Sequence, residues 1–111
     1  MASRGAQTIR AADAAMAELE NKAAEAAALL KLLANENRLL ILCRLALKGE
    51  MAVGDLADAV GLSQSALSQH LAKMRDEGLV ATRREAQTIF YRIADDNAKR
   101  LLMLLKDIYC P

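Results

Sequence analysis

Residues 63–78, with the sequence SQSALSQHLAKMRDEG, are the stretch from which the fold of this chain follows. Leu67, Leu71 and Met74 are spaced at i, i+4 and i+7, which gives a helix one narrow apolar stripe. Ser63 stands where the N-cap of such a helix is expected. The face opposite this stripe carries mainly short, amide or hydroxyl side chains together with Lys73, whereas an ordinary solvated face is rich in both Glu and Lys.

This polar face predicts contact with DNA by a helix over about residues 63–77. Gln and Ser side chains can hydrogen-bond to base edges, and a Lys ammonium pairs with phosphate. The candidate contacts on this helix are Gln64, Ser65, Ser68, Gln69, His70 and Lys73. His70 flanks the apolar stripe, so it serves either as a phosphate contact or as a packed edge residue. The alternatives are an ordinary helix pair with a solvated second helix, and a protein-binding winged helix, which would present an acidic or apolar outer face.

The segments before this helix have helical patterns of their own. Residues 53–62 (VGDLADAVGL) predict a shorter amphipathic helix that Gly61 ends. A helix, a glycine turn and a helix with a polar outer face are the helix-turn-helix pattern. Further upstream, residues 35–49 (NENRLLILCRLALKG) predict a helix that Asn35 caps and Gly49 ends.

After the helix-turn-helix, the pattern changes to strand alternation. Residues 80–84 and 89–93 are rich in β-favouring side chains and predict a hairpin over about residues 79–93. A hairpin at this place is the wing of a winged helix. Because the connection at residues 85–88 lacks Gly and Asn, we expect a loop of about four residues instead of a tight turn. The side chains expected to reach phosphates or a minor groove are Arg83, Arg84 and Arg92, with Thr88 as a further candidate. A plain hairpin with solvated arginines is the alternative.

The chain of 111 residues predicts one domain, mainly α with a small β-hairpin. We expect a flexible N-terminus over residues 1–8 and a single winged helix-turn-helix domain over residues 9–111, with dimerisation helices at both ends. Residues 9–34 are Ala-rich and fit one long helix or two shorter ones. Residues 95–111 predict a last helix with apolar side chains most of the way round, which something must cover. A homodimer is the simplest cover.

Composition narrows the class of protein further. The formal net charge is only +1, so DNA binding requires a local basic patch; residues 73–92 carry five basic side chains against three acidic ones. No apolar run is long enough to cross a bilayer and no signal-peptide pattern is present, so we expect a cytoplasmic protein with no membrane partner. No acid–base constellation or Gly-rich phosphate loop is found, and we do not expect an enzyme.

The order of these elements resembles the ArsR/SmtB family of bacterial repressors. The residues that carry the resemblance are 37–42 (NRLLIL), 61–71 (GLSQSALSQHL), 74–80 (MRDEGLV) and 91–93 (YRI). It covers roughly residues 25–110 of the chain. The resemblance implies a homodimer that binds an imperfect palindrome in double-stranded DNA and is released by a small inducer.

Metal is the inducer of many members of that family. One group uses a Cys-x-Cys pair in the first helix of the helix-turn-helix, where this chain has LADAV. Another uses Asp and His pairs on the last helix, where residues 98–109 of this chain contain no His and only Asp107. Zinc requires three or four nitrogen or sulfur ligands. One protomer offers only Cys43, Cys110 and the distant His70, so we expect no metal site.

The two cysteines instead resemble the sulfide- and persulfide-responsive subgroup known as BigR, SqrR and YgaV. That subgroup implies that persulfides or polysulfides oxidise Cys43 and Cys110 to a bridge containing extra sulfur, and that the bridged protein leaves DNA. The local sequence does not itself predict a reactive thiolate, and a buried core cysteine is the commoner role for a residue such as Cys43. Disulfide formation by peroxide stays an alternative. The Cys110-Pro111 dipeptide resembles a weak haem-ligation signature, and no other cofactor is expected.

Overall fold

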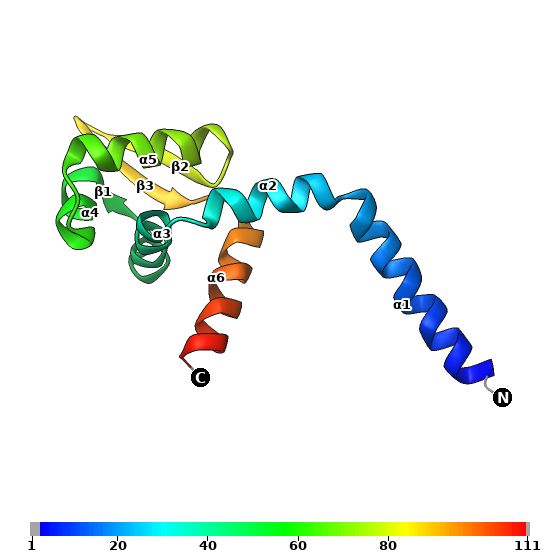
Figure 1. The fold of residues 1–111 in the computed structure, drawn as a ribbon. Coiled ribbons are helices and arrows are strands. Elements are labelled where there is room, and N and C mark those ends of the chain that lie inside the picture. The colour runs from blue at the N-terminus through cyan, green and yellow to red at the C-terminus, as the bar shows by residue number, and fades with distance from the viewer. Residues whose placement is uncertain (1–2, 111) are drawn as a thin grey trace. The chain divides into compact units, whose positions relative to one another are not determined.

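The structure, a computed structural model, describes the backbone of residues 3–110 and the side chains of residues 10–110. Figure 1 shows the order of the elements along the chain. The chain divides into two compact units, Met1–Leu33 and Ala34–Pro111. We expected one domain over residues 9–111; how the two units associate in an assembly stays a prediction.

The N-terminal unit contains two helices, α1 (Ser3–Asn21) and α2 (Ala23–Leu33). Of the two possibilities left open by the sequence, two shorter helices are therefore observed. We expected a flexible segment over residues 1–8; α1 begins at Ser3, residues 1–2 lie outside the described part, and the flexibility of this segment stays a prediction. The Ala-rich sequence explains this early start, since Ala is the strongest helix former. Among the side chains that are described in this unit, the large apolar ones that are more than half exposed are Met16, Leu19 and Leu30.

The C-terminal unit combines four helices with a small sheet (Figure 1). In chain order its elements are α3 (Glu36–Lys48), β1 (Met51–Ala52), α4 (Val53–Val60), α5 (Gln64–Asp76), β2 (Val80–Glu85), β3 (Thr88–Ile93) and α6 (Asp96–Tyr109). Helices α4 and α5 form the predicted helix-turn-helix, and β2 and β3 form the predicted wing. These elements are those of a winged helix-turn-helix.

The helix ends are fixed by local hydrogen bonds that the sequence predicted. The Asn35 side chain accepts from the backbone N–H of Arg38 at 3.1 Å, and Ser63 Oγ accepts from that of Ala66 at 3.1 Å. Gly61 follows α4 with φ +71, the left-handed conformation that glycine adopts without strain. Asp95 caps α6 in the same manner. The turn between α4 and α5 is therefore set by its own residues.

The sheet has three antiparallel strands in the order β1-β3-β2, and two of its features differ from expectation. Strand β1 was not predicted. The wing loop is also tighter than expected: Glu85 pairs with Thr88, so only Ala86 and Gln87 connect the strands. Ala86 makes this possible by adopting φ +55, a left-handed value that Gly or Asn takes more readily. The prediction of a four-residue loop was wrong.

The core of this unit gathers the apolar stripes of its helices. Leu67, Leu71 and Met74 of α5 have no exposed surface, which confirms the stripe that the sequence predicted. The other fully buried side chains are Ile41, Leu42, Leu45, Leu56 and Leu79. Helix α6 is different, since it buries Ala98 and Leu102 while the apolar side chains at 103, 104, 108 and 109 stay more than half exposed.

Candidate DNA interface and thiol site

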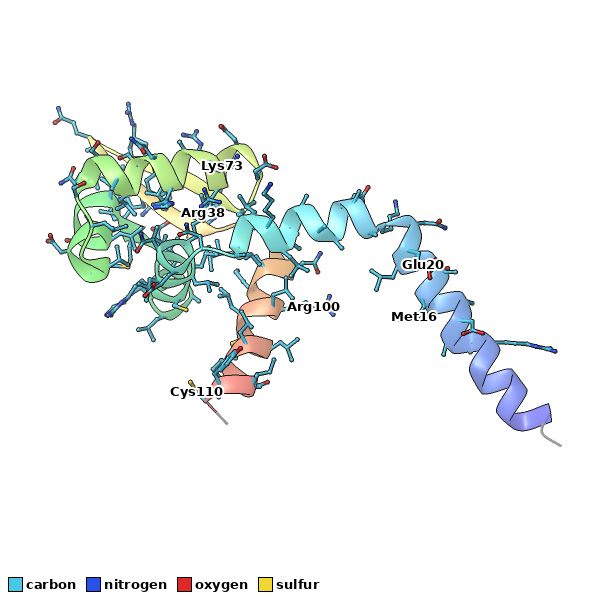
Figure 2. All side chains as sticks on the ribbon, in the orientation of Figure 1. Met16, Glu20, Arg38, Lys73, Arg100 and Cys110 are labelled. Atoms are coloured by element: carbon cyan, nitrogen blue, oxygen red, sulfur yellow. The ribbon has the colours of Figure 1, made fainter. Side chains whose placement is uncertain are left out.

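The polar face of α5 is directed away from the core. Because Leu67, Leu71 and Met74 are buried, the helical period places the remaining side chains outside. The predicted contacts that are exposed on this helix are Gln64, Ser65, Ser68, Gln69 and Lys73. Figure 2 shows Lys73 on this helix. Amide, hydroxyl and ammonium groups therefore lie on one accessible face, as contact with bases and phosphates requires.

His70 occupies a different position from the other predicted contacts. Its ring is half-buried, and Nδ1 accepts a hydrogen bond from Arg38 Nε of α3 at 3.4 Å. Of the two roles considered for His70, this geometry fits the packed edge residue. The bond joins α3 to the DNA-facing helix.

Arg83 of the wing is engaged within the protein. Its Nε and Nη2 donate to the carboxylate of Glu50, the shortest bond being 2.6 Å, and its Nη1 donates to Glu85 at 2.9 Å. The guanidinium also lies over the Phe90 ring, 4.7 Å from the centroid. We predicted Arg83 as a phosphate contact, but its donors serve two carboxylates in this structure. Arg84, Thr88 and Arg92 are exposed on the same hairpin.

The pKa values of this ion pair are shifted in the directions that mutual stabilisation requires. The hydrogen bonds from Arg83 lower the pKa of the Glu50 carboxyl below its ordinary 4.5, and burial opposes this only in part. The same bonds raise the pKa of Arg83. Sequence reasoning missed Glu50, because it lies 33 residues from Arg83 and no local pattern links the two.

The two cysteines are brought to one place. Cys43 lies on α3, and Cys110 directly follows α6, where its N–H donates to the carbonyl of Lys106 at 2.7 Å. Both are exposed free thiols. They line a single hollow of about 510 Å³, together with Leu39, Leu102, Leu105, Lys106 and Tyr109. Figure 2 shows Cys110 at the far end of α6.

A core role for Cys43, the commoner alternative, is wrong for this protomer. The side of α3 that packs into the core carries Ile41, Leu42 and Leu45. Each residue turns a helix by about 100°, so Cys43 lies beyond this stripe and borders the hollow. Pro111, the second residue of the haem-like dipeptide, lies outside the described residues.

Two other classes of site were searched for within the described part of the chain. No group of three or more His, Cys, Asp or Glu side chains there could hold a metal ion. None of the helices described is both long and apolar enough to span a membrane.

Comparison with known proteins gives concordant sequence and structural matches. The model of the family described as bacterial regulatory protein, arsR family, matches residues 35–82. The transcriptional activator HlyU of Vibrio cholerae is 53% identical over 84% of this chain and 85% of its own length.

Solved structures agree with these sequence matches. The crystal structure of the transcriptional repressor BigR from Xylella fastidiosa is 40% identical and matches with a TM-score of 0.80, over 86% of this chain and 97% of BigR. The homodimeric winged helix-turn-helix DNA-binding domain of Mb0332 from Mycobacterium bovis is 38% identical and matches with a TM-score of 0.66, over 84% of this chain and 82% of that domain.

Proposed function

Because the chain belongs to the arsR family of bacterial DNA-binding transcriptional regulators, we propose that it is a homodimeric repressor that leaves its operator when a persulfide or polysulfide oxidises Cys43 and Cys110. The observation that carries the proposal is the placement of both thiols along one hollow between α3 and α6. HlyU is a transcriptional activator and BigR a transcriptional repressor, and the proposed direction for this chain is repression. Such a protein acts in the cytoplasm, where its operator is.

Operator binding would use the exposed face of α5 and the wing. The Gln and Ser side chains of α5 would meet base edges in the major groove, and Lys73 would pair with phosphate. In the wing, Arg84 and Thr88 are the exposed candidates for backbone or minor-groove contact. A homodimer would place its two α5 helices in successive major grooves about 34 Å apart, which matches an imperfect palindrome.

The proposed oxidation can be written so that atoms and electrons balance. Each cysteine thiolate attacks the outer sulfur of a persulfide RSSH and releases the thiol RSH, so that both residues become persulfides. One of these then attacks the inner sulfur of the other and displaces hydrogen sulfide, leaving a trisulfide between Cys43 and Cys110. Overall, two thiols and two RSSH give one trisulfide, two RSH and H₂S. Thiol oxidation is thus coupled to reduction of sulfane sulfur, with no further oxidant.

The bridge must act on the DNA-binding state and not only on stability. A link between Cys43 and Cys110 would join α3 to α6. Helix α6 also carries the exposed apolar side chains proposed for the dimer interface, so a changed α3–α6 arrangement would alter the spacing of the two α5 helices. A coupling free energy of about 1–3 kcal/mol is usual for such linkage and corresponds to a 5- to 150-fold loss of affinity.

The proposal is tested by measuring mass and DNA binding on the same samples. The probe is a 30-base-pair duplex that the reduced protein selects from a random library (its length is about three helical turns). Reduced protein is treated with glutathione persulfide or with hydrogen peroxide. We expect persulfide to add one sulfur atom and remove two hydrogen atoms, and to release the duplex. Cys43→Ser and Cys110→Ser should bind the duplex but not be released.

Other outcomes contradict parts of the proposal. Release after peroxide with loss of only two hydrogen atoms would assign a general oxidant sensor. Release by persulfide that survives in both serine variants would remove the two cysteines from the switch. Unchanged DNA binding by fully bridged protein would show that the bridge is not regulatory.

A further inference from the structure

Arg83 connects all three strands of the wing sheet. The register pairs Arg83 on β2 with Phe90 on β3, and Phe90 with Ala52 on β1. Directly paired residues share a face of the sheet, so these three side chains form one row. Glu50, two residues before Ala52, lies next to this row. The Arg83 side chain crosses over Phe90 to reach Glu50, and in doing so it spans from one edge of the sheet to the other.

Glu50 stands at a junction in the fold. It follows Gly49, which ends α3, and it precedes β1 by one residue. Its bonds to Arg83 therefore attach β2, the outer strand of the wing, to the segment that leaves α3. The two residues of β1 give β3 only a short paired edge, and the ion pair is the contact that extends this attachment to β2.

The charges on this face nearly cancel. Arg83 is bonded to both Glu50 and Glu85, and Arg92 adds a further favourable charge near Glu50. A phosphate would have to displace two carboxylates from Arg83 before it could bind there. Arg84, the adjacent residue on β2, faces the opposite side of the sheet and is exposed.

We propose that Arg83 is a positioning residue for DNA binding, which fixes the wing to the end of α3 through Glu50 and does not itself bind phosphate. The inference rests on the proposed DNA interface of α5 and the wing. It also predicts a change in DNA affinity opposite in sign to the change expected from charge alone. Removing the negative charge of Glu50 should weaken DNA binding, although loss of an acidic group near DNA would by charge alone strengthen it.

The test uses the reduced full-length protein, the selected duplex described above, and the dependence of affinity on salt. Each phosphate contact contributes about 0.9 to the slope of log K against log salt. Glu50→Gln and Arg83→Lys should each weaken binding about twofold to fivefold, the effect of losing one ordered surface contact, with the slope unchanged. Arg83→Lys keeps the charge but loses the two-pronged bonds to Glu50. The control Arg84→Gln should lower the slope by about one.

Hydrogen exchange gives a readout independent of DNA. In Glu50→Gln and Arg83→Lys, the amides of β2 should exchange faster while those of α5 stay as in the wild type. Tighter or unchanged DNA binding in Glu50→Gln overturns the inference. The inference also fails if Arg83→Lys binds DNA with wild-type affinity while Arg83→Gln lowers the salt slope. If Arg84→Gln and Lys73→Ala also leave the slope unchanged, the proposed DNA interface itself fails.

Discussion

Leu104→Ala should weaken the proposed homodimer without unfolding the protomer. Leu104 is 54% exposed on α6, in the apolar group formed with Met103, Ile108 and Tyr109. Fully burying a leucine is worth about 1.5–3 kcal/mol, so the exposed half offers about 1 kcal/mol or slightly more to a partner. A two-fold interface contains each position twice, which gives a loss of about 2–3 kcal/mol per dimer. The dimer dissociation constant should rise about 30- to 150-fold.

Sedimentation equilibrium over a concentration series measures this constant directly. Far-UV circular dichroism should stay unchanged, because Ala maintains the helix and the lost atoms are exposed in the protomer. Leu47→Ala is the matched control: Leu47 is 71% exposed on α3, between the charged side chains of Arg44 and Lys48. Because Leu47 lies on α3, outside the apolar group of α6, this variant should dimerise as the wild type does.

The dimer prediction has a clear contrary result. A dissociation constant within twofold of the wild type for Leu104→Ala, and again for Leu104→Ala combined with Ile108→Ala, would place the interface elsewhere. An equal loss in Leu47→Ala would mean that the effect is general and does not identify α6.

Two further predictions concern DNA binding and pH. Lys73→Ala should weaken binding to all duplexes and lower the salt slope by about one. Gln69→Ala should instead relax base preference, at a cost of about 1–3 kcal/mol on the selected duplex. If the two variants change the salt slope and the base preference equally, these roles are rejected. Arg83 lowers the pKa of the Glu50 carboxyl, so the unfolded chain binds the proton more readily than the folded chain does. The ion pair therefore stabilises the fold above pH 4.5. This contribution is lost as the pH falls through the lowered pKa. Urea midpoints of wild type and Glu50→Gln should therefore differ at pH 7 and converge as the pH falls below the lowered pKa of Glu50; a constant difference would contradict the linkage.

What the sequence could predict was local. The caps at Asn35, Gly61 and Ser63 and the stripe at Leu67 and Leu71 each depend on residues within a few positions of one another. Helical spacing and capping hydrogen bonds act over this range. The helix-turn-helix was therefore predictable almost residue by residue.

The tight wing turn shows where a local rule gives way to tertiary pairing. Ala86 is a poor residue for a positive φ, which led us to expect a longer loop. The two strands are paired along their whole length, from Val80 and Ile93 to Glu85 and Thr88. This ladder of paired residues therefore continues to the end of the hairpin. The ladder, whose inner end is anchored by the buried Val80 and Ile93, offsets the strain at one alanine.

The surroundings of Arg83 and Cys43 could not be predicted from the sequence, because they depend on distant partners. Arg83 was expected at phosphate because nothing nearby in the sequence reveals Glu50, and a buried Cys43 was the commoner expectation because its helical neighbours are apolar. Whether an apolar neighbour covers a side chain or turns away from it is decided by how helices pack. The sequence singled out the two cysteines by resemblance alone, and their functional role stays a prediction; their placement along one hollow required the fold.

Helix α3 contacts each of the parts that the proposed switch must connect. It carries Cys43 beside the hollow, its Arg38 donates to His70 of α5, and Glu50 just after its end holds Arg83 of the wing. A sulfur bridge from α3 to α6 would thus act on a helix that is joined to both DNA-binding elements. Even a small rotation of α3 would then move α5 and the wing together, because packed elements shift as rigid bodies more readily than they deform. Under this mechanism the Arg38–His70 and Glu50–Arg83 contacts transmit the signal, and weakening them should reduce release by persulfide as well as affinity for DNA.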